Sequence, residues 1–166
     1  MVPRSIIALC LVCIGGALTA CASSGTTMPS PSESRVVTES PADRDINELV
    51  ASIAAEQIGV RYRYGGTTPS TGFDCSGLVH YSFMQAGLTV PRTSRDQFRA
   101  ARKIALNQAQ PGDIVFFQDQ EKLSHVGIYL GDRRFVHAPS SGKTVSIAQI
   151  DSSYYQQHLV AVGRLH

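Results

Sequence analysis

A division into three compositional segments limits what this chain can fold into. Residues 1–20 are apolar, residues 22–45 are rich in Ser, Thr, Pro and Glu, and residues from 46 onward have the mixed composition of a globular domain. The middle segment has too few large apolar side chains to offset the entropy that ordering it would cost. We therefore expect a disordered tether over 21–45 and a single folded domain over 46–166.

The first segment, 1–20, is typical of a secretory signal peptide. Arg4 precedes an apolar stretch of about 16 residues that ends in small side chains. A helix needs about 20 apolar residues to span a bilayer, and the pair Gly15-Gly16 would weaken one. A retained membrane anchor is the alternative.

The segment ends in Leu18-Thr19-Ala20-Cys21, which resembles the bacterial lipoprotein signal. The resemblance implies that Cys21 becomes the lipidated N-terminus and that its acyl chains anchor the protein to a membrane. Ala22 follows the cysteine, a pattern that implies the inner leaflet of the outer membrane, facing the periplasm.

Charge and cysteine content narrow the function further. The formal net charge is +2 and Lys and Arg form no run, which argues against a nucleic-acid partner. Cleavage of the predicted signal peptide would remove Cys10 and Cys13, and lipid would modify Cys21. Cys75 is then the sole free thiol of an exported protein, so it is either buried and inert or reactive.

The globular segment predicts helices first and strands afterward. Apolar residues recur at helical spacing over 46–58, 75–86 and about 94–102. Strand patterns follow over 113–118, 125–130, 134–138, 144–147 and 159–162, the first of them apolar enough to be covered on both faces. This order indicates an α+β fold, with N-terminal helices packed on an antiparallel sheet.

Cys75 lies at the predicted start of the second helix, where backbone N–H groups favour an anion. This position is expected to lower the pKa of a thiol and to offer N–H groups to an oxyanion. Asp74 is a candidate cap for the helix. A small buried cysteine is the plainer interpretation.

A nucleophilic cysteine needs a base, and the base needs a third group to orient it. His80 is expected to point away from Cys75, and His158 and His166 have no supporting motif. His125 and His137 lie on consecutive predicted strands. They share a sheet face only if the turn at 131–133 has three residues or a bulge intervenes, so we predict one of these. Structural histidines or a zinc site with Cys75 are the alternatives, but no pair has short zinc spacing.

Six segments together closely resemble the NlpC-type cell-wall cysteine peptidases, and the likeness covers 46–166. The segments are YRYGG at 62–66, GFDCSGLV at 72–79, PRTS at 91–94, PGDIVFF at 111–117, SHVGIYL at 124–130 and FVHA at 135–138. The resemblance implies a compact papain-like enzyme without cofactor or metal, close to lipoprotein murein endopeptidases. No separate wall-binding domain is recognised.

The resemblance also implies roles for individual residues. Cys75 would be the nucleophile, His125 its base and His137 the group that orients the base. Tyr64 would line the site and help to bind substrate or oxyanion. Asp74, Ser76 and Arg92 are substrate-binding candidates, although Asp74 could be only a cap and Arg92 only a surface residue.

The implied substrate is peptidoglycan, cut in a stem peptide or a cross-link through a thioester. D-Ala–diaminopimelate and D-Glu–diaminopimelate bonds both fit, and the likeness favours the cross-link. A monomer restrained by a regulatory protein is expected. The alternatives are a catalytically silent wall-binding or scaffold lipoprotein and an acyl-transfer enzyme.

Overall fold

The computed structural model describes residues 41–119 and 122–166 of the 166-residue chain. The predicted signal peptide, the predicted lipidation site Cys21 and most of the predicted tether lie outside these residues. Within the described part, no helix has the length and apolar character needed to cross a membrane.

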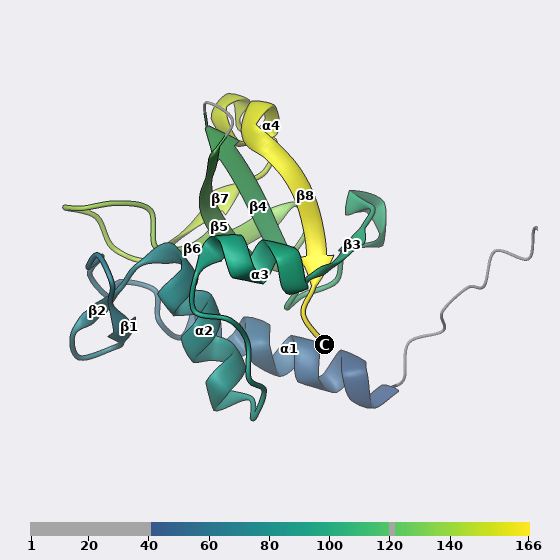
Figure 1. Ribbon diagram of the computed structural model, residues 1–166, viewed down its shortest axis with the longest axis horizontal. Helices are drawn as coiled ribbons and strands as arrows, with labels where there is room; N and C mark the ends of the chain where they lie inside the picture. The colour runs from purple at the N-terminus through teal and green to yellow at the C-terminus, as the bar shows by residue number, and fades with distance from the viewer. Residues whose placement is uncertain (1–40, 120–121) are drawn as a thin grey trace, which may run out of the picture. The chain divides into compact units, whose positions relative to one another are not determined.

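The folded part is an α+β domain (Figure 1). Six antiparallel strands form one sheet in the order β3-β8-β4-β5-β6-β7, and a separate ribbon pairs β1 with β2. The elements are α1 (Pro41–Ala55), β1 (Thr67–Thr68), β2 (Gly72–Phe73), α2 (Cys75–Gln85), α3 (Ser94–Ala100), β3 (Arg102–Ile104), a 3₁₀ turn (Leu106–Gln108), β4 (Ile114–Asp119), β5 (Lys122–Gly131), β6 (Arg134–His137), β7 (Ser146–Gln149), α4 (Ser153–His158) and β8 (Leu159–Arg164).

Two hydrophobic cores lie on opposite faces of the sheet, and β4 contributes to both. Ile114 and Phe116 belong to the core beneath α1, α2 and α3, whereas Val115 and Phe117 belong to the second core, which Tyr155 of α4 packs against. All four β4 side chains are essentially inaccessible to solvent. The prediction of a strand covered on both faces is therefore confirmed.

Helix α1 begins at Pro41, five residues before the expected domain boundary. The expectation of a disordered tether is thus wrong for residues 41–45. Proline suits the first turn of a helix, because its missing N–H removes no helical hydrogen bond there. The negative charge of Asp43 in the same turn interacts favourably with the positive end of the helix dipole. The apolar pattern begins only at Ile46, so periodicity alone missed this turn.

Two elements of the sheet layer were not predicted, and one strand was misplaced. Strand β3 has three residues, two of them exposed and charged, and α4 is a six-residue polar helix. Neither has an apolar period long enough to detect. Strand β7 runs over 146–149 rather than 144–147, because Val145 is buried in the first core and Thr144 only forms an isolated bridge with Arg61.

The β5–β6 hairpin contains the predicted irregularity. Asp132 and Arg133 both have positive φ, 50° and 57°, as in a two-residue type I′ turn, and the register shifts between Tyr129 and Gly131. The bulge leaves Ile128 opposite Val136. A bulge was one of the two predicted solutions, and it puts residues 125, 127 and 137 on one face of the sheet.

Candidate active site

Cys75 is the first residue of α2, and its sulfur is surrounded by backbone donors. The backbone N–H groups of Val126, Ser76 and Cys75 act on the sulfur to lower the pKa of the thiol, and the side chain is half-buried. Val126 directly follows His125, so the thiol lies beside the segment that carries the expected base. The prediction that Cys75 begins a helix is confirmed.

Glycines allow the first turn of α2 to pack closely against the YRYGG loop. A Cβ atom on Gly77 would lie 2.0 Å from the carbonyl oxygen of Gly66, so no other residue fits without moving the helix. The N–H of Asp74 donates to the same carbonyl at 3.2 Å. These contacts fix where Cys75 stands relative to the loop.

Asp74 is the N-cap of α2 and the centre of a polar cluster. Its carboxylate accepts from the N–H groups of Gly77, at 2.6 Å, and Gly65, at 2.9 Å. Arg92 donates to both carboxylate oxygens at 3.0 and 2.7 Å, and to the Ser76 hydroxyl at 2.9 Å. The expected cap is confirmed. Arg92 is also tied into the site, so the interpretation of a mere surface residue is wrong.

The tyrosine beside the thiol is Tyr62 and not Tyr64. The Tyr64 side chain is 89% exposed, which does not support the expectation that it lines the site. Tyr62 is partly buried against the first core together with Cys75. Burial, followed by the negative charges of Cys75 and Asp74, raises the pKa of Tyr62. The segment contains two tyrosines two residues apart, and only tertiary packing distinguishes them.

His125 and His137 meet as the bulge predicts. Nε2 of His125 lies 2.7 Å from Nδ1 of His137, and the rings cross at 76°. His137 is 3% exposed. Phe117 stacks on His125, and Phe135 and Tyr155 pack against His137. The pair therefore lies against an aromatic wall that restricts the motion of both rings.

The other histidines that the structure describes contact backbone carbonyls outside the site. Nδ1 of His80 lies 2.9 Å from the Val90 carbonyl, and Nδ1 of His158 lies 2.6 Å from the Tyr154 carbonyl. Nε2 of His166 contacts the Asp43 carbonyl at 3.5 Å. The expectation that His80 points elsewhere is confirmed. The described residues include no group of three or more His, Cys, Asp or Glu that could hold a metal ion.

The Cys75 thiol and the two imidazoles are neutral at rest, contrary to the expected thiolate. Burial, together with the charge of Asp74, raises the pKa of the Cys75 thiol and outweighs the backbone N–H groups that lower it. Burial lowers the pKa of His125 to about 4 and that of His137, which also lies near His125 and Lys143, to about 3. Forming a thiolate at this site would therefore require a proton to leave the thiol during the reaction.

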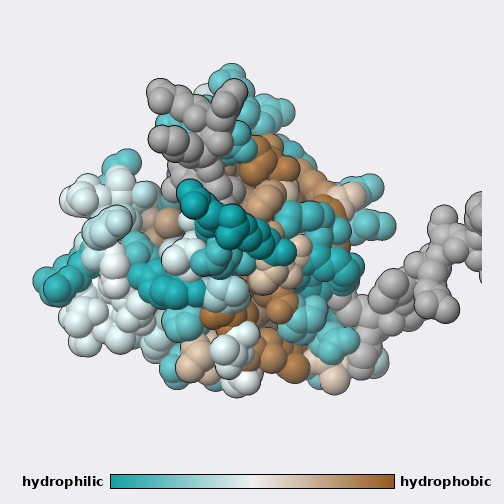
Figure 2. All heavy atoms as spheres, viewed as in Figure 1, coloured by the Kyte–Doolittle hydropathy of each residue, from teal (hydrophilic) through white to brown (hydrophobic). Residues whose placement is uncertain are grey.

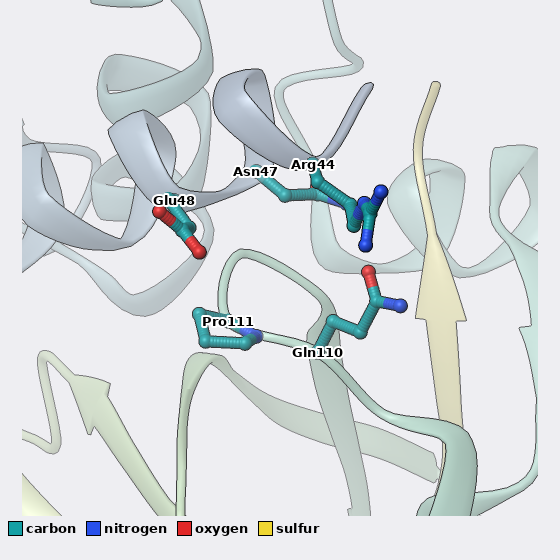
Figure 3. A pocket seen from close by; sticks show the side chains of 5 residues that line it. All are labelled: Arg44, Asn47, Glu48, Gln110 and Pro111. Carbon is teal, nitrogen blue, oxygen red and sulfur yellow. The ribbon is translucent and has the colours of Figure 1, made fainter. Parts of the chain in front are cut away.

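The surface around the YRYGG loop is polar. Side chains of intermediate hydropathy gather over the loops around β1 and β2 (Figure 2). A cavity of about 210 Å³ lies elsewhere, between α1 and the loop before β4 (Figure 3), lined by Arg44, Asn47, Glu48, Gln110 and Pro111. Gly112, which follows the lining residue Pro111, donates its N–H to the Tyr129 carbonyl. Tyr129 lies four residues after His125 in β5, near the end of the strand. This cavity is therefore separate from Cys75 and the histidine pair.

Proteins named as cell-wall peptidases are similar in sequence to this chain. The chain is 42% identical over 124 residues to the bifunctional muramidase/DL-endopeptidase CwlT of Bacillus subtilis, covering 73% of this chain and 37% of that protein. It is 38% identical over 115 residues to the murein DD-endopeptidase MepH of Escherichia coli, covering 66% and 42%. The chain thus corresponds to less than half the length of either relative.

Solved structures show the same fold. A Staphylococcus aureus protein described as similar to a lipoprotein of the NLP/P60 family superposes with a TM-score of 0.68 at 33% identity, covering 78% of this chain and 44% of that one. The NlpC/p60 domain of the peptidoglycan hydrolase SagA gives 0.63 at 30% identity, covering 71% and 97%. The model of the NlpC/P60 family matches residues 59–164 of this chain. This chain therefore belongs to the NlpC/P60 family.

Proposed function

We propose that this chain is a peptidoglycan endopeptidase that uses Cys75 as nucleophile, His125 as general base and His137 to orient the base. The observation that carries the proposal is the 2.7 Å contact between the two imidazoles, and the Val126 N–H, next to His125 in the chain, lowers the pKa of the Cys75 thiol. Nucleophile, base and orienting group are the three parts that covalent catalysis requires.

The proposed reaction begins with a proton transfer. Because Nε2 of His125 faces His137, Nδ1 is the nitrogen left to take the thiol proton as sulfur attacks the amide carbonyl carbon. The C–S bond forms, and backbone N–H groups at the start of α2 stabilise the oxyanion. The C–N bond then breaks as His125 returns the proton to the leaving amine. Water, deprotonated by His125, hydrolyses the thioester and restores the thiol.

The substrate class follows from the names of the relatives. One is called a DL-endopeptidase and another a murein DD-endopeptidase, so both kinds of peptide bond are candidates. The polar loops around β1 and β2 suit a hydrophilic peptide. We favour cleavage of the cross-link bond between D-Ala and diaminopimelate, which the sequence resemblance also favours.

The location and assembly rest on sequence alone. Lipidation of Cys21 would hold the enzyme on the inner leaflet of the outer membrane, within reach of the wall. We propose a monomer whose activity a regulatory protein restrains, because unrestrained cutting of cross-links would endanger the cell. Metabolic labelling with a fatty-acid analogue tests lipidation: wild type is labelled and Cys21→Ser is not.

The function is tested with unlipidated protein on purified muropeptides. Residues 22–166 keep helix α1 whole, which a fragment starting at 46 would not. Wild type and Cys75→Ala are incubated in parallel, and products are identified by mass. Loss of cross-linked dimers in wild type alone indicates a DD-endopeptidase, and shortened stems with intact dimers indicate a DL-endopeptidase. A folded wild type without any Cys75-dependent product would favour the silent scaffold.

A further inference from the structure

Gln97 of α3 is a fully buried polar residue beside the nucleophile helix. Its side chain has no exposed surface. Nε2 donates to the Ser76 carbonyl at 3.0 Å and to the Pro91 carbonyl at 2.8 Å. Because both neighbours are acceptors, only the NH₂ end of the amide can face them, and the orientation of the side chain is determined.

The two carbonyls belong to segments that meet at Cys75. Ser76 directly follows the cysteine in α2. Pro91 directly precedes Arg92, whose guanidinium holds both carboxylate oxygens of Asp74. Asp74 in turn caps α2 and directly precedes Cys75. One amide group thus links the first turn of the nucleophile helix to the loop that delivers Arg92.

The other end of the same amide makes no comparable contact. Oε1 is buried and has no hydrogen-bond partner among the described residues. Among the described residues, the side-chain hydrogen bonds of Gln97 therefore run only through its two amide N–H groups, toward the site. A carboxylate at this position would set negative charge against two carbonyl oxygens.

We propose that Gln97 is a positioning residue for Cys75, which acts by fixing the first turn of α2 and the Arg92–Asp74 pair relative to each other. The inference rests on the proposed role of Cys75 as nucleophile. Without the amide, the loop at Pro91 is free to shift and Arg92 balances the charge of Asp74 less completely. The thiol beside Asp74 then becomes harder to ionise, and attack becomes slower.

The test compares Gln97→Met with Gln57→Met in the protein of residues 22–166. Gln57 is a matched control because it is 7% exposed and its Nε2 donates to a backbone carbonyl, that of Ile53 in α1, rather than to the first turn of α2 or the loop at Pro91. For both variants we measure the melting temperature, the pH profile of Cys75 alkylation by iodoacetamide, and kcat and KM on muropeptides.

We expect Q97M to lower kcat about tenfold, the size of effect that losing buried hydrogen bonds produces, and to shift alkylation to higher pH. Q57M should leave both at wild-type values. Q97E should recover activity as pH falls, because a protonated carboxyl can again donate one hydrogen bond. In an Arg92→Met background, Q97M should lower kcat/KM less than it does in wild type, because both changes act on one assembly.

Two results would overturn the proposal. One is a Q97M protein with a lower melting temperature but with wild-type kcat and a wild-type alkylation profile, which would indicate a purely structural role. The other is a fully multiplicative effect of Q97M and R92M. If wild type itself cuts no muropeptide, the proposed function fails, whereas the alkylation profiles of Q97M and Q57M still decide the role of Gln97.

Discussion

Nε2 of His125 and Nδ1 of His137 lie 2.7 Å apart, so a single proton occupies the contact between the two imidazoles. When that proton belongs to His125, its Nδ1 is free to act as a base, and His137 accepts. When it belongs to His137, the Nδ1 of His125 carries the remaining proton and cannot act as a base. The orienting residue therefore acts by selecting a tautomer.

Substitutions at the two histidines should have unequal effects. We expect His125→Ala to lower kcat/KM by roughly 10²–10⁴-fold, the usual contribution of a general base. His137→Asn should remain up to about tenfold more active than His137→Ala, because an amide oxygen can still accept from Nε2. Steady-state kinetics on muropeptides check this order. Equal activity of the Asn and Ala variants would contradict the orienting role.

Alkylation of Cys75 should report a neutral resting thiol. Because burial raises the pKa of the thiol and lowers the pKa of His125, an ion pair does not form in the free enzyme. The rate with iodoacetamide should rise with pH into the alkaline range, at a higher pH than for a free thiol. His125→Ala should have nearly the same profile. A plateau between pH 5 and 8 in wild type would reveal a preformed ion pair instead.

Stability should fall as the solution is acidified below the ordinary histidine pKa. The folded protein lowers the pKa of His125 to about 4 and that of His137 to about 3, from a usual 6.5. At these two sites the unfolded chain binds more protons below pH 6.5, which favours unfolding by on the order of a few kcal/mol by pH 4, while Asp113, whose pKa burial raises to about 7, acts in the opposite direction. Urea unfolding at pH 7, 5 and 4 measures the loss. His137→Gln should show a shallower dependence, and an unchanged slope would contradict the assignment.

The buried ion pair between Asp113 and Arg164 should be important for stability. Arg164 donates to both carboxylate oxygens at 2.7 and 2.8 Å, and the two side chains are 0% and 6% exposed. Asp113→Ala leaves a buried guanidinium without this partner, and we expect a loss of about 3–5 kcal/mol. Arg99→Gln, in an exposed pair with Asp96, should cost less than about 1 kcal/mol. Denaturant titration compares them, and similar losses would contradict the prediction.

The sequence predicted the parts of the site that depend on local pattern. Asp74 caps α2 before Cys75, and hairpin geometry correctly brought His125 and His137 to one face. Alternation of side chains along a strand and spacing along a helix are local properties, and both are visible in one chain.

The remaining features depend on contacts between distant segments. The Gln97 amide reaches Ser76 and Pro91, and nothing in its neighbourhood along the chain marks it as buried. The thiol pKa was expected to be low because a helix start was visible, but burial and the charge of Asp74 outweigh the helix. Tyr62 and Tyr64 belong to the same local motif, and only the tertiary structure determines that Tyr62 packs against the core while Tyr64 is exposed.

The bulge between Tyr129 and Gly131 makes chain length at this hairpin a condition for the contact between His125 and His137, and so for the proposed catalysis. Deleting one residue there would turn His137 to the opposite face of the sheet while leaving every catalytic side chain in the sequence. Such a protein could retain its sheet and its family motifs and still be inactive. Related chains that differ by a single insertion or deletion between residues 129 and 134 are therefore candidates for lost activity, even where the three motif residues persist.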